Sequence, residues 1–115
     1  MKKSYFLIIA MIFIMMACQK DDFGLSDCLN EKITEFKNGD FACSDVEDGA
    51  NVKEYEFQGV KVYVFDPGTC GADLFSEVID EDCNTMGNLG GIAGLSEING
   101  INFSEAELIK TVWER

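Results

Sequence analysis

The segment from Val52 to Phe65 constrains the fold of this chain more than any other. Its apolar residues recur at every second position, which is the period of a β-strand, and Gln58-Gly59 at its centre is a two-residue turn sequence. This turn predicts a β-hairpin in a single register. The opposed residues are Phe57 with Val60, Tyr55 with Val62, and Lys53 with Val64.

This register sorts the hairpin side chains onto two faces. One face collects the apolar residues and is expected to contact the core. The other face sets Glu56 opposite Lys61, a cross-strand charge pair that stabilises a hairpin by about 0.2–1 kcal/mol. The apolar face consists of Tyr55, Phe57, Val60, Val62 and Val64.

Two regular elements are predicted on either side of the hairpin. Residues 27–37 are predicted to form a helix, because Ser26 can cap its start and apolar residues recur at helical spacing. Asn38-Gly39 is a suitable end for this helix. Residues 74–79 are predicted to form a third strand, after the break at Asp66-Pro67-Gly68.

The C-terminal third is harder to interpret. Residues 84–95 are dominated by glycine, which favours turns, bulges and close backbone packing. Residues 105–115 fit two structures: Ser104 and Glu107 form a capping box, which favours a helix, whereas the nearly alternating β-rich residues that follow favour a closing strand. Of the two, the strand is favoured.

The first 17 residues differ in kind from the rest. Two lysines precede an uncharged, apolar run from Tyr5 to Ala17. This run is shorter than the ~20 apolar residues that a membrane-spanning helix needs, and it has the length of a signal-peptide core. Its end, Met15-Met16-Ala17-Cys18, resembles the lipobox of bacterial lipoproteins, with Met where Leu is commoner. Residues 1–17 are therefore predicted to be a lipoprotein signal peptide, and Cys18 the site of lipid attachment; the alternative is an ordinary secretory signal.

The residues after Cys18 bear on the side of the membrane that the protein faces. Lys20, Asp21 and Asp22 resemble the surface-export signal of Bacteroidota lipoproteins. The resemblance implies an outer-membrane, lipid-anchored protein that is exposed at the cell surface. Residues 18–26 are predicted to be a lipidated tether. In the alternative, Lys20, Asp21 and Asp22 are merely the first residues of this polar tether and the protein faces the periplasm.

Four cysteines follow Cys18, and an even number in a small exported domain predicts two disulfides. A zinc site is disfavoured, because the chain has no histidine and its cysteines are not clustered. A straight third strand would hold Cys70 and Cys83 too far apart to bridge. Because the hairpin brings Cys43 and Cys70 to one end of the sheet, the favoured pairs are Cys43–Cys70 and Cys28–Cys83.

Charge and composition exclude several functions. Without residues 1–17 the chain keeps seven basic and 21 acidic residues, a net charge of −14, so neither nucleic acid nor an anionic membrane face is an expected partner. The absence of histidine excludes Ser–His and Cys–His nucleophiles. The acidic loops 45–49 and 80–84 do not fit the EF-hand pattern, and Gly87–Gly94 lacks the Lys-Ser/Thr of a P-loop. No metal and no cofactor are predicted.

Several motifs together resemble a domain family of unknown function found in short Bacteroidota lipoproteins. The likeness runs from about Asp27 to Glu114, and it implies a bacterial group but no activity, substrate or catalytic residue. The motifs are Cys28-Leu-x-x-Lys-Ile-x-x-Phe36, the hairpin Val52–Phe65, Asp66-Pro-Gly-x-Cys-Gly-Ala-Asp73 and Leu89-Gly-Gly-Ile-Ala-Gly94.

Residues 27–115 are thus predicted to be a single small α+β domain, in which one N-terminal helix packs on an antiparallel sheet of about four strands stapled by two disulfides. The expected role is that of a non-enzymatic binding or interaction module, held to a membrane through the lipid on Cys18, whose protein or small-molecule partner the sequence does not name. One alternative is a small carboxylate-dependent hydrolase, and another is an exported enzyme inhibitor that presents the loop 67–73. The candidate carboxylate pairs for a hydrolase are Asp66 with Asp73 and Asp80 with Asp82.

Overall fold

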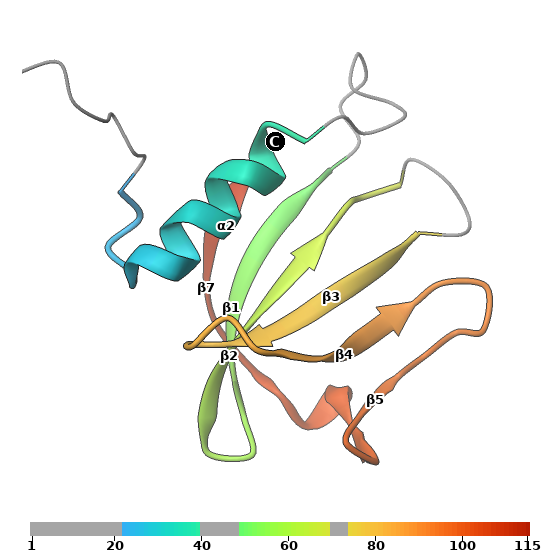
Figure 1. The fold of residues 1–115 in the computed structure, drawn as a ribbon. Coiled ribbons are helices and arrows are strands. Elements are labelled where there is room, and N and C mark those ends of the chain that lie inside the picture. The colour runs from blue at the N-terminus through green and yellow to red at the C-terminus, as the bar shows by residue number, and fades with distance from the viewer. Residues whose placement is uncertain (1–21, 40–48, 70–73) are drawn as a thin grey trace, which may run out of the picture.

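The structure, a computed structural model, describes residues 22–39, 49–69 and 74–115. Its centre is a five-stranded antiparallel sheet in the order β4-β3-β2-β1-β7 (Figure 1). A helix packs against this sheet, and a two-stranded ribbon of β5 and β6 precedes the last strand. The elements are α2 (Asp27–Lys37), β1 (Asn51–Phe57), β2 (Val60–Asp66), β3 (Phe75–Asp80), β4 (Thr85–Gly90), β5 (Glu97–Ile98), β6 (Ile101–Asn102), the 3-10 helix η2 (Phe103–Glu105) and β7 (Glu107–Glu114).

The β1–β2 hairpin has the register that the sequence predicts. Phe57 lies opposite Val60, and Glu56 lies opposite Lys61. The turn residues Gln58 and Gly59 have φ angles of 52° and 80°, as a two-residue turn with both central residues in the left-handed region requires. The hairpin prediction is confirmed.

Both faces of the central sheet are buried, which the sequence analysis did not anticipate. The face toward α2 packs Val52, Tyr63 and Phe65 against the helix. The opposite face packs Phe57, Val62 and Val64 against Ile98 of β5. Because each face has its own cover, the middle of β2 is buried at four consecutive residues instead of at alternate ones.

Helix α2 forms where its capping signals predict it. The Oγ of Ser26 accepts a hydrogen bond from the backbone N–H of Leu29, and Asn38 caps the other end. Leu29 and Ile33 are fully buried against the sheet. Phe36 adds edge-on ring contacts to Phe65 and to Trp113, with ring centroids 5.3 and 5.9 Å apart.

The first half of the glycine-rich stretch forms a strand that was not predicted, and the predicted turn follows it at residues 91–94. Residues 85–90 pair with β3 along the edge of the sheet as β4. A Cβ added at Gly87 would lie 2.9 Å from the Cδ1 atom of Ile98, so glycine here makes room for the β5 residue that covers the sheet. The chain reverses after Gly90 and Gly91, which both have positive φ.

The predicted α+β class with four strands is wrong. Over the described residues the protein is mostly antiparallel β, with five strands in the main sheet, two more in a small ribbon and one short α-helix at residues 27–37, which is not clearly N-terminal. One segment accounts for the fifth strand of the main sheet: residues 85–90 extend it at one edge as β4, whereas residues 107–114 form β7 beside β1 at the other edge. The strand favoured for the C-terminal tail is therefore confirmed, and the third strand is confirmed at Phe75–Asp80.

Candidate functional site

A polar pocket lies between the start of α2, the β1–β2 hairpin and the β3–β4 turn. Its volume is about 490 Å³, within the range of roughly 300–1,000 Å³ that small-molecule sites occupy. The polar side chains that line it are Ser26, Glu54, Lys61, Tyr63, Glu81, Asp82 and Lys110. We refer to this cavity as the Glu54 pocket.

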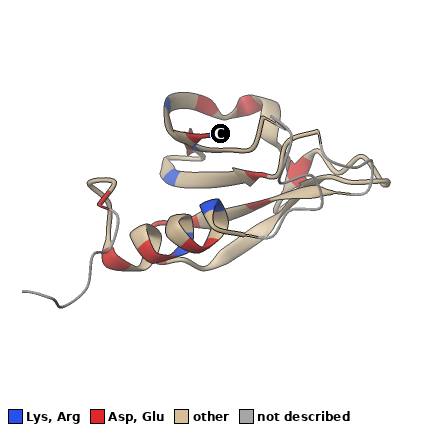
Figure 2. Ribbon diagram, turned by 90° about the horizontal axis from the view of Figure 1, so that it is seen from above, with Lys and Arg blue, Asp and Glu red and all other residues tan. Residues whose placement is uncertain are grey.

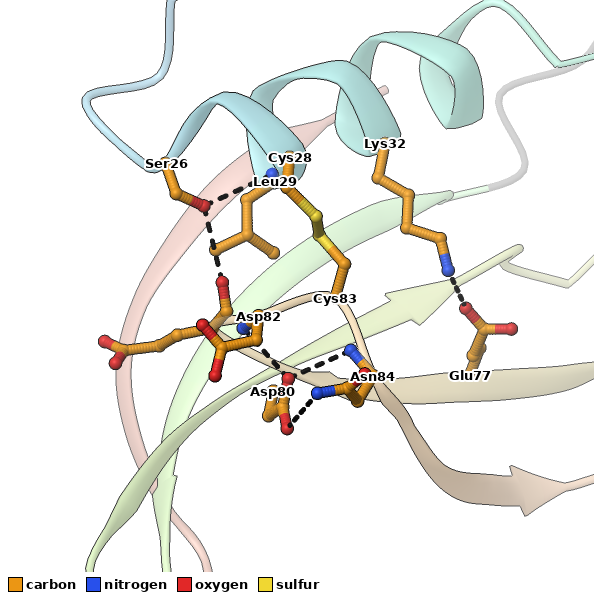
Figure 3. The surroundings of a disulfide bond; sticks show 10 residues. Ser26, Cys28, Leu29, Lys32, Glu77, Asp80, Asp82, Cys83 and Asn84 are labelled. Atoms are coloured by element: carbon orange, nitrogen blue, oxygen red, sulfur yellow. Dashed lines mark hydrogen bonds and ion pairs between the residues drawn. A yellow bond between two sulfur atoms is a disulfide. The ribbon is translucent and has the colours of Figure 1, made fainter.

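One wall of the Glu54 pocket is the β3–β4 turn, which the carboxylate of Asp80 organises. Its Oδ1 accepts hydrogen bonds from the backbone N–H groups of Asp82 and Asn84, each at 2.9 Å (Figure 3). These bonds, the Asn84 backbone bond first, hold the pKa of Asp80 below its ordinary value. The turn also places Cys83 in the left-handed region, with φ 64°.

Two links tie this wall to helix α2. A disulfide joins Cys28 to Cys83, and the Ser26 hydroxyl donates to the backbone carbonyl of Glu81 at 3.4 Å (Figure 3). A third contact lies further along the helix, where the Lys32 Nζ and the Glu77 Oε1 form an ion pair at 2.7 Å. The disulfide and the Ser26 hydrogen bond thus fix the start of α2 against the β3–β4 turn, and both segments line the pocket.

Glu54 lines the pocket and is the most unusual side chain in it. It is 4% exposed, although it is a carboxylate in the middle of β1. The Tyr63 hydroxyl, on the neighbouring strand, donates a hydrogen bond of 2.8 Å to Glu54 Oε1. Burial first, and then this contact with Glu54, raises the pKa of Tyr63, so the phenol stays protonated and remains a donor.

The second carboxylate oxygen of Glu54 has no hydrogen-bond partner among the residues that the structure describes. In that part of the chain no fully buried side-chain oxygen lacks a partner. Glu54 Oε2 therefore keeps some accessible surface, and because Glu54 lines the pocket, this oxygen opens into it. The pocket therefore contains an acceptor that has no partner among the described residues.

Charges of both signs surround this acceptor. Lys110 is the β7 neighbour of Glu54, and Lys61 lies on β2; both line the pocket and both are exposed. Within the described residues neither lysine comes within 4.0 Å of a carboxylate oxygen of Glu54. Glu81 and Asp82 form the acidic side of the rim.

The predicted site residues are only partly within the described structure. Cys28–Cys83 is the pair that the sequence favoured, whereas Cys43 and Cys70 lie outside the described residues. Cys18, Lys20 and Asp21 lie outside them too. Asp22 is described, and its Oδ1 accepts hydrogen bonds from the Gly24 N–H and the Asn30 side-chain amide.

The candidate hydrolase acids make turns. Asp66 accepts from the Gly68 N–H, and Asp80 and Asp82 are joined through a backbone bond in the turn described above. Asp73 and residues 45–48 of the first acidic loop lie outside the described residues. Across the described parts of the chain no group of three or more metal-ligating side chains gathers. The acidic residues are spread over the helix, strands and turns (Figure 2).

The Glu54 pocket was not predicted from the sequence, because only the opposite face of the hairpin was expected to contact the core. A signal was present: Val52 and Glu54 alternate onto one face, opposite Phe65 and Tyr63 of β2. The apolar face of the predicted helix must also pack against one face of the sheet. If that is the face with Val52, Glu54 lies next to the contact between helix and sheet.

The lowered pKa of Asp80 predicts how the stability of the protein depends on pH. Because the folded-state pKa of Asp80 is lowered from 3.8, its charged form stabilises the fold above that pH, and this contribution is lost as the pH falls through the folded pKa. At pH 7 we expect the order of stability to be wild type, then Asp80→Asn, which keeps an acceptor oxygen, then Asp80→Ala. Urea titrations at pH 7 and well below 3.8 should show the gap between wild type and Asp80→Asn closing. A constant gap would contradict this role.

Comparisons with known proteins give a family and no activity. In the described part of the chain no helix is both long and apolar enough to cross a bilayer. No curated protein matches the chain, and no solved structure matches it. A family model described as a domain of unknown function, DUF6970, matches residues 42–115, which include the whole sheet but not α2. The chain belongs to this family of domains of unknown function.

Proposed function

We propose that this protein is a lipoprotein of the bacterial cell envelope, held by lipid on Cys18, whose domain is a non-enzymatic binding module. The Glu54 pocket is its binding site. The observation that carries the binding role is a preformed polar pocket lined by a buried carboxylate, Glu54, with one hydrogen-bonded oxygen and one without a partner in the described structure. The proposal assigns the protein to the Bacteroidota and to the outer membrane.

The anchor rests on the sequence that precedes the domain. The apolar run up to Ala17 ends directly at Cys18 with a small residue before the cysteine. A diacylglycerol with two acyl chains anchors a protein stably, since each buried CH₂ contributes about 0.8 kcal/mol. The acidic residues Asp21 and Asp22 and the lysine before them support display at the surface.

The binding role rests on what the pocket contains. Its lining has carboxylates, lysines and a phenol, and the chain has no histidine that could activate a serine or cysteine nucleophile. The phenol of Tyr63 is held protonated by burial, which suits a hydrogen-bond donor. These features favour recognition over bond cleavage.

Replacement of Cys18 tests the anchor. We expect Cys18→Ala to remove the protein from the membrane fraction, because the thiol that receives the lipid is gone. Two controls accompany this variant. Ala17→Asp removes the small residue before Cys18 and shows the result of failed processing, and the wild type shows normal anchoring. Immunoblots of membrane and soluble fractions measure the outcome, and a Cys18→Ala protein that still sediments with the membrane contradicts the anchor.

Protease added to intact cells tests the side of the membrane. We expect the wild-type domain to be digested while a periplasmic control protein stays intact. Replacing Lys20, Asp21 and Asp22 by alanine together should protect the domain without releasing it from the membrane. Digestion of both forms alike would contradict the export role of these three residues.

A further inference from the structure

The unused oxygen of Glu54 points to a specific ligand chemistry, and this step rests on the proposed binding function. A carboxylate that is 4% exposed is unfavourable unless hydrogen bonds or an opposite charge compensate it. In the described structure it has a single neutral donor, the Tyr63 hydroxyl. The position is therefore incomplete without a further donor.

The missing donor is best supplied from the pocket. Glu54 Oε2 opens into it, as argued above from its lack of a partner and its remaining accessibility. A primary ammonium is compact, carries three donors and forms strong charge-assisted bonds to carboxylates. Glu81 and Asp82, which also line the pocket, add negative potential that favours binding of a cation.

The pocket also has groups that suit an anion. Lys61 and Lys110 line it from β2 and β7, on the two strands that flank β1, and Lys110 is the cross-strand neighbour of Glu54. A ligand that carries an ammonium and a carboxylate close together would match both Glu54 and the lysines. The volume of about 490 Å³ is large enough for an amino acid or a short peptide.

We propose that the Glu54 pocket binds an amino acid or short peptide, with the α-ammonium on Glu54 and the carboxylate on Lys61 and Lys110. The frame that positions Glu54 is already rigid, because β1 lies between two paired strands and the disulfide fixes the rim. Little conformational freedom is lost on binding, which favours affinity for a small ligand.

The test uses the mature lipoprotein in detergent and three alanine tripeptides as probes. The first has both termini free, the second is acetylated at its N-terminus, and the third is amidated at its C-terminus. Isothermal titration should show binding of the free tripeptide. Acetylation should weaken binding about 10- to 100-fold, as loss of a hydrogen-bonded charge pair does, and amidation should weaken it less, because the lysines are exposed.

Two substitutions complete the design. Glu54→Gln keeps an oxygen to accept from Tyr63 but removes the charge, and we expect it to bring the free tripeptide down to the affinity of the acetylated one. Glu97→Gln, an exposed glutamate on β5, removes the same charge and should change nothing. If Glu54→Gln fails to fold, the acetylated probe on the wild type still decides the question.

The outcomes separate this inference from the proposed function. Equal binding of the free and acetylated peptides, no binding of the free peptide, or a Glu54→Gln protein with undiminished affinity would each overturn the ligand assignment. The anchor is measured independently by fractionation of the Cys18→Ala protein. A protein that is anchored but ignores all three peptides keeps its envelope location and loses the assignment made here.

Discussion

A Cys28→Ala/Cys83→Ala double variant is expected to lose about 4 kcal/mol of its free energy of unfolding. The bridge closes a loop over a sequence separation of 55 residues, and a cross-link of that span restricts the unfolded chain by this amount in the loop-entropy description. The folded state loses a link as well, because the bridge ties α2 to the β3–β4 turn. Urea unfolding followed by circular dichroism measures the change.

The design of this experiment separates the bridge from the side chains. Alanine is small enough for both sites, and Cys83 has a positive φ that alanine tolerates as poorly as cysteine does. A Ser26→Ala variant, which removes only the helix cap and the hydroxyl contact to Glu81, is a control expected to cost about 1 kcal/mol. A double cysteine variant no less stable than this control would contradict the structural role of the bridge.

Phe57→Ala is expected to destabilise the protein by about 3–5 kcal/mol, the usual cost of truncating a buried aromatic side chain. Phe57 is 2% exposed and belongs to the cluster that covers the face of the sheet away from α2. Its ring lies 5.1 Å from that of Phe103, which the β6–β7 connection holds over the sheet. Loss of the ring would leave a cavity between the sheet and this cover.

The residue opposite Phe57 provides a matched control. Val60 faces it across the hairpin in the same register, but is 48% exposed. We expect Val60→Ala to cost less than about 1 kcal/mol, because little apolar surface leaves water there on folding. Equal losses for the two variants, measured by urea unfolding, would mean that the second face is not covered as described.

The sequence predicted correctly those elements whose conformation depends on residues within the element itself. Gln58-Gly59 sets the hairpin register because both positions must accept positive φ, and the register carries every cross-strand pair with it. Ser26 and Asn38 bound the helix in the same local way. Residues 107–114 form the favoured strand beside β1, as their β-rich sequence predicts.

The rest depends on contacts between distant segments. Residues 85–90 have few strand-forming side chains, and they form β4 because β3 offers a free edge and Gly87 leaves space for Ile98. The sequence pattern assigned one buried face to the hairpin, whereas α2 and the β5–η2 segment cover one face each. The pattern of apolar residues within β1 does not indicate that a second segment covers its other face.

The candidate site was hidden for the same reason. Glu54 reads as a solvated strand residue until Tyr63, the helix start and the β3–β4 turn are placed around it. The Cys28–Cys83 disulfide could be predicted from geometry. The third strand separates Cys70 from Cys83 by too great a distance for a bridge, which leaves fewer possible partners for Cys83. The spacing of cysteines along the chain limits which disulfides can form, whereas no spacing indicates which side chains will line a pocket.

The mass of the mature N-terminal peptide tests the account most directly. Purified from the membrane fraction of its own bacterium and digested with protease, the protein should yield a first peptide that begins at Cys18 and carries a diacylglycerol on its thiol. A first peptide that begins at Met1, or one that starts at residue 18 with a free thiol, would contradict the lipid anchor and with it the placement of this domain in the cell envelope.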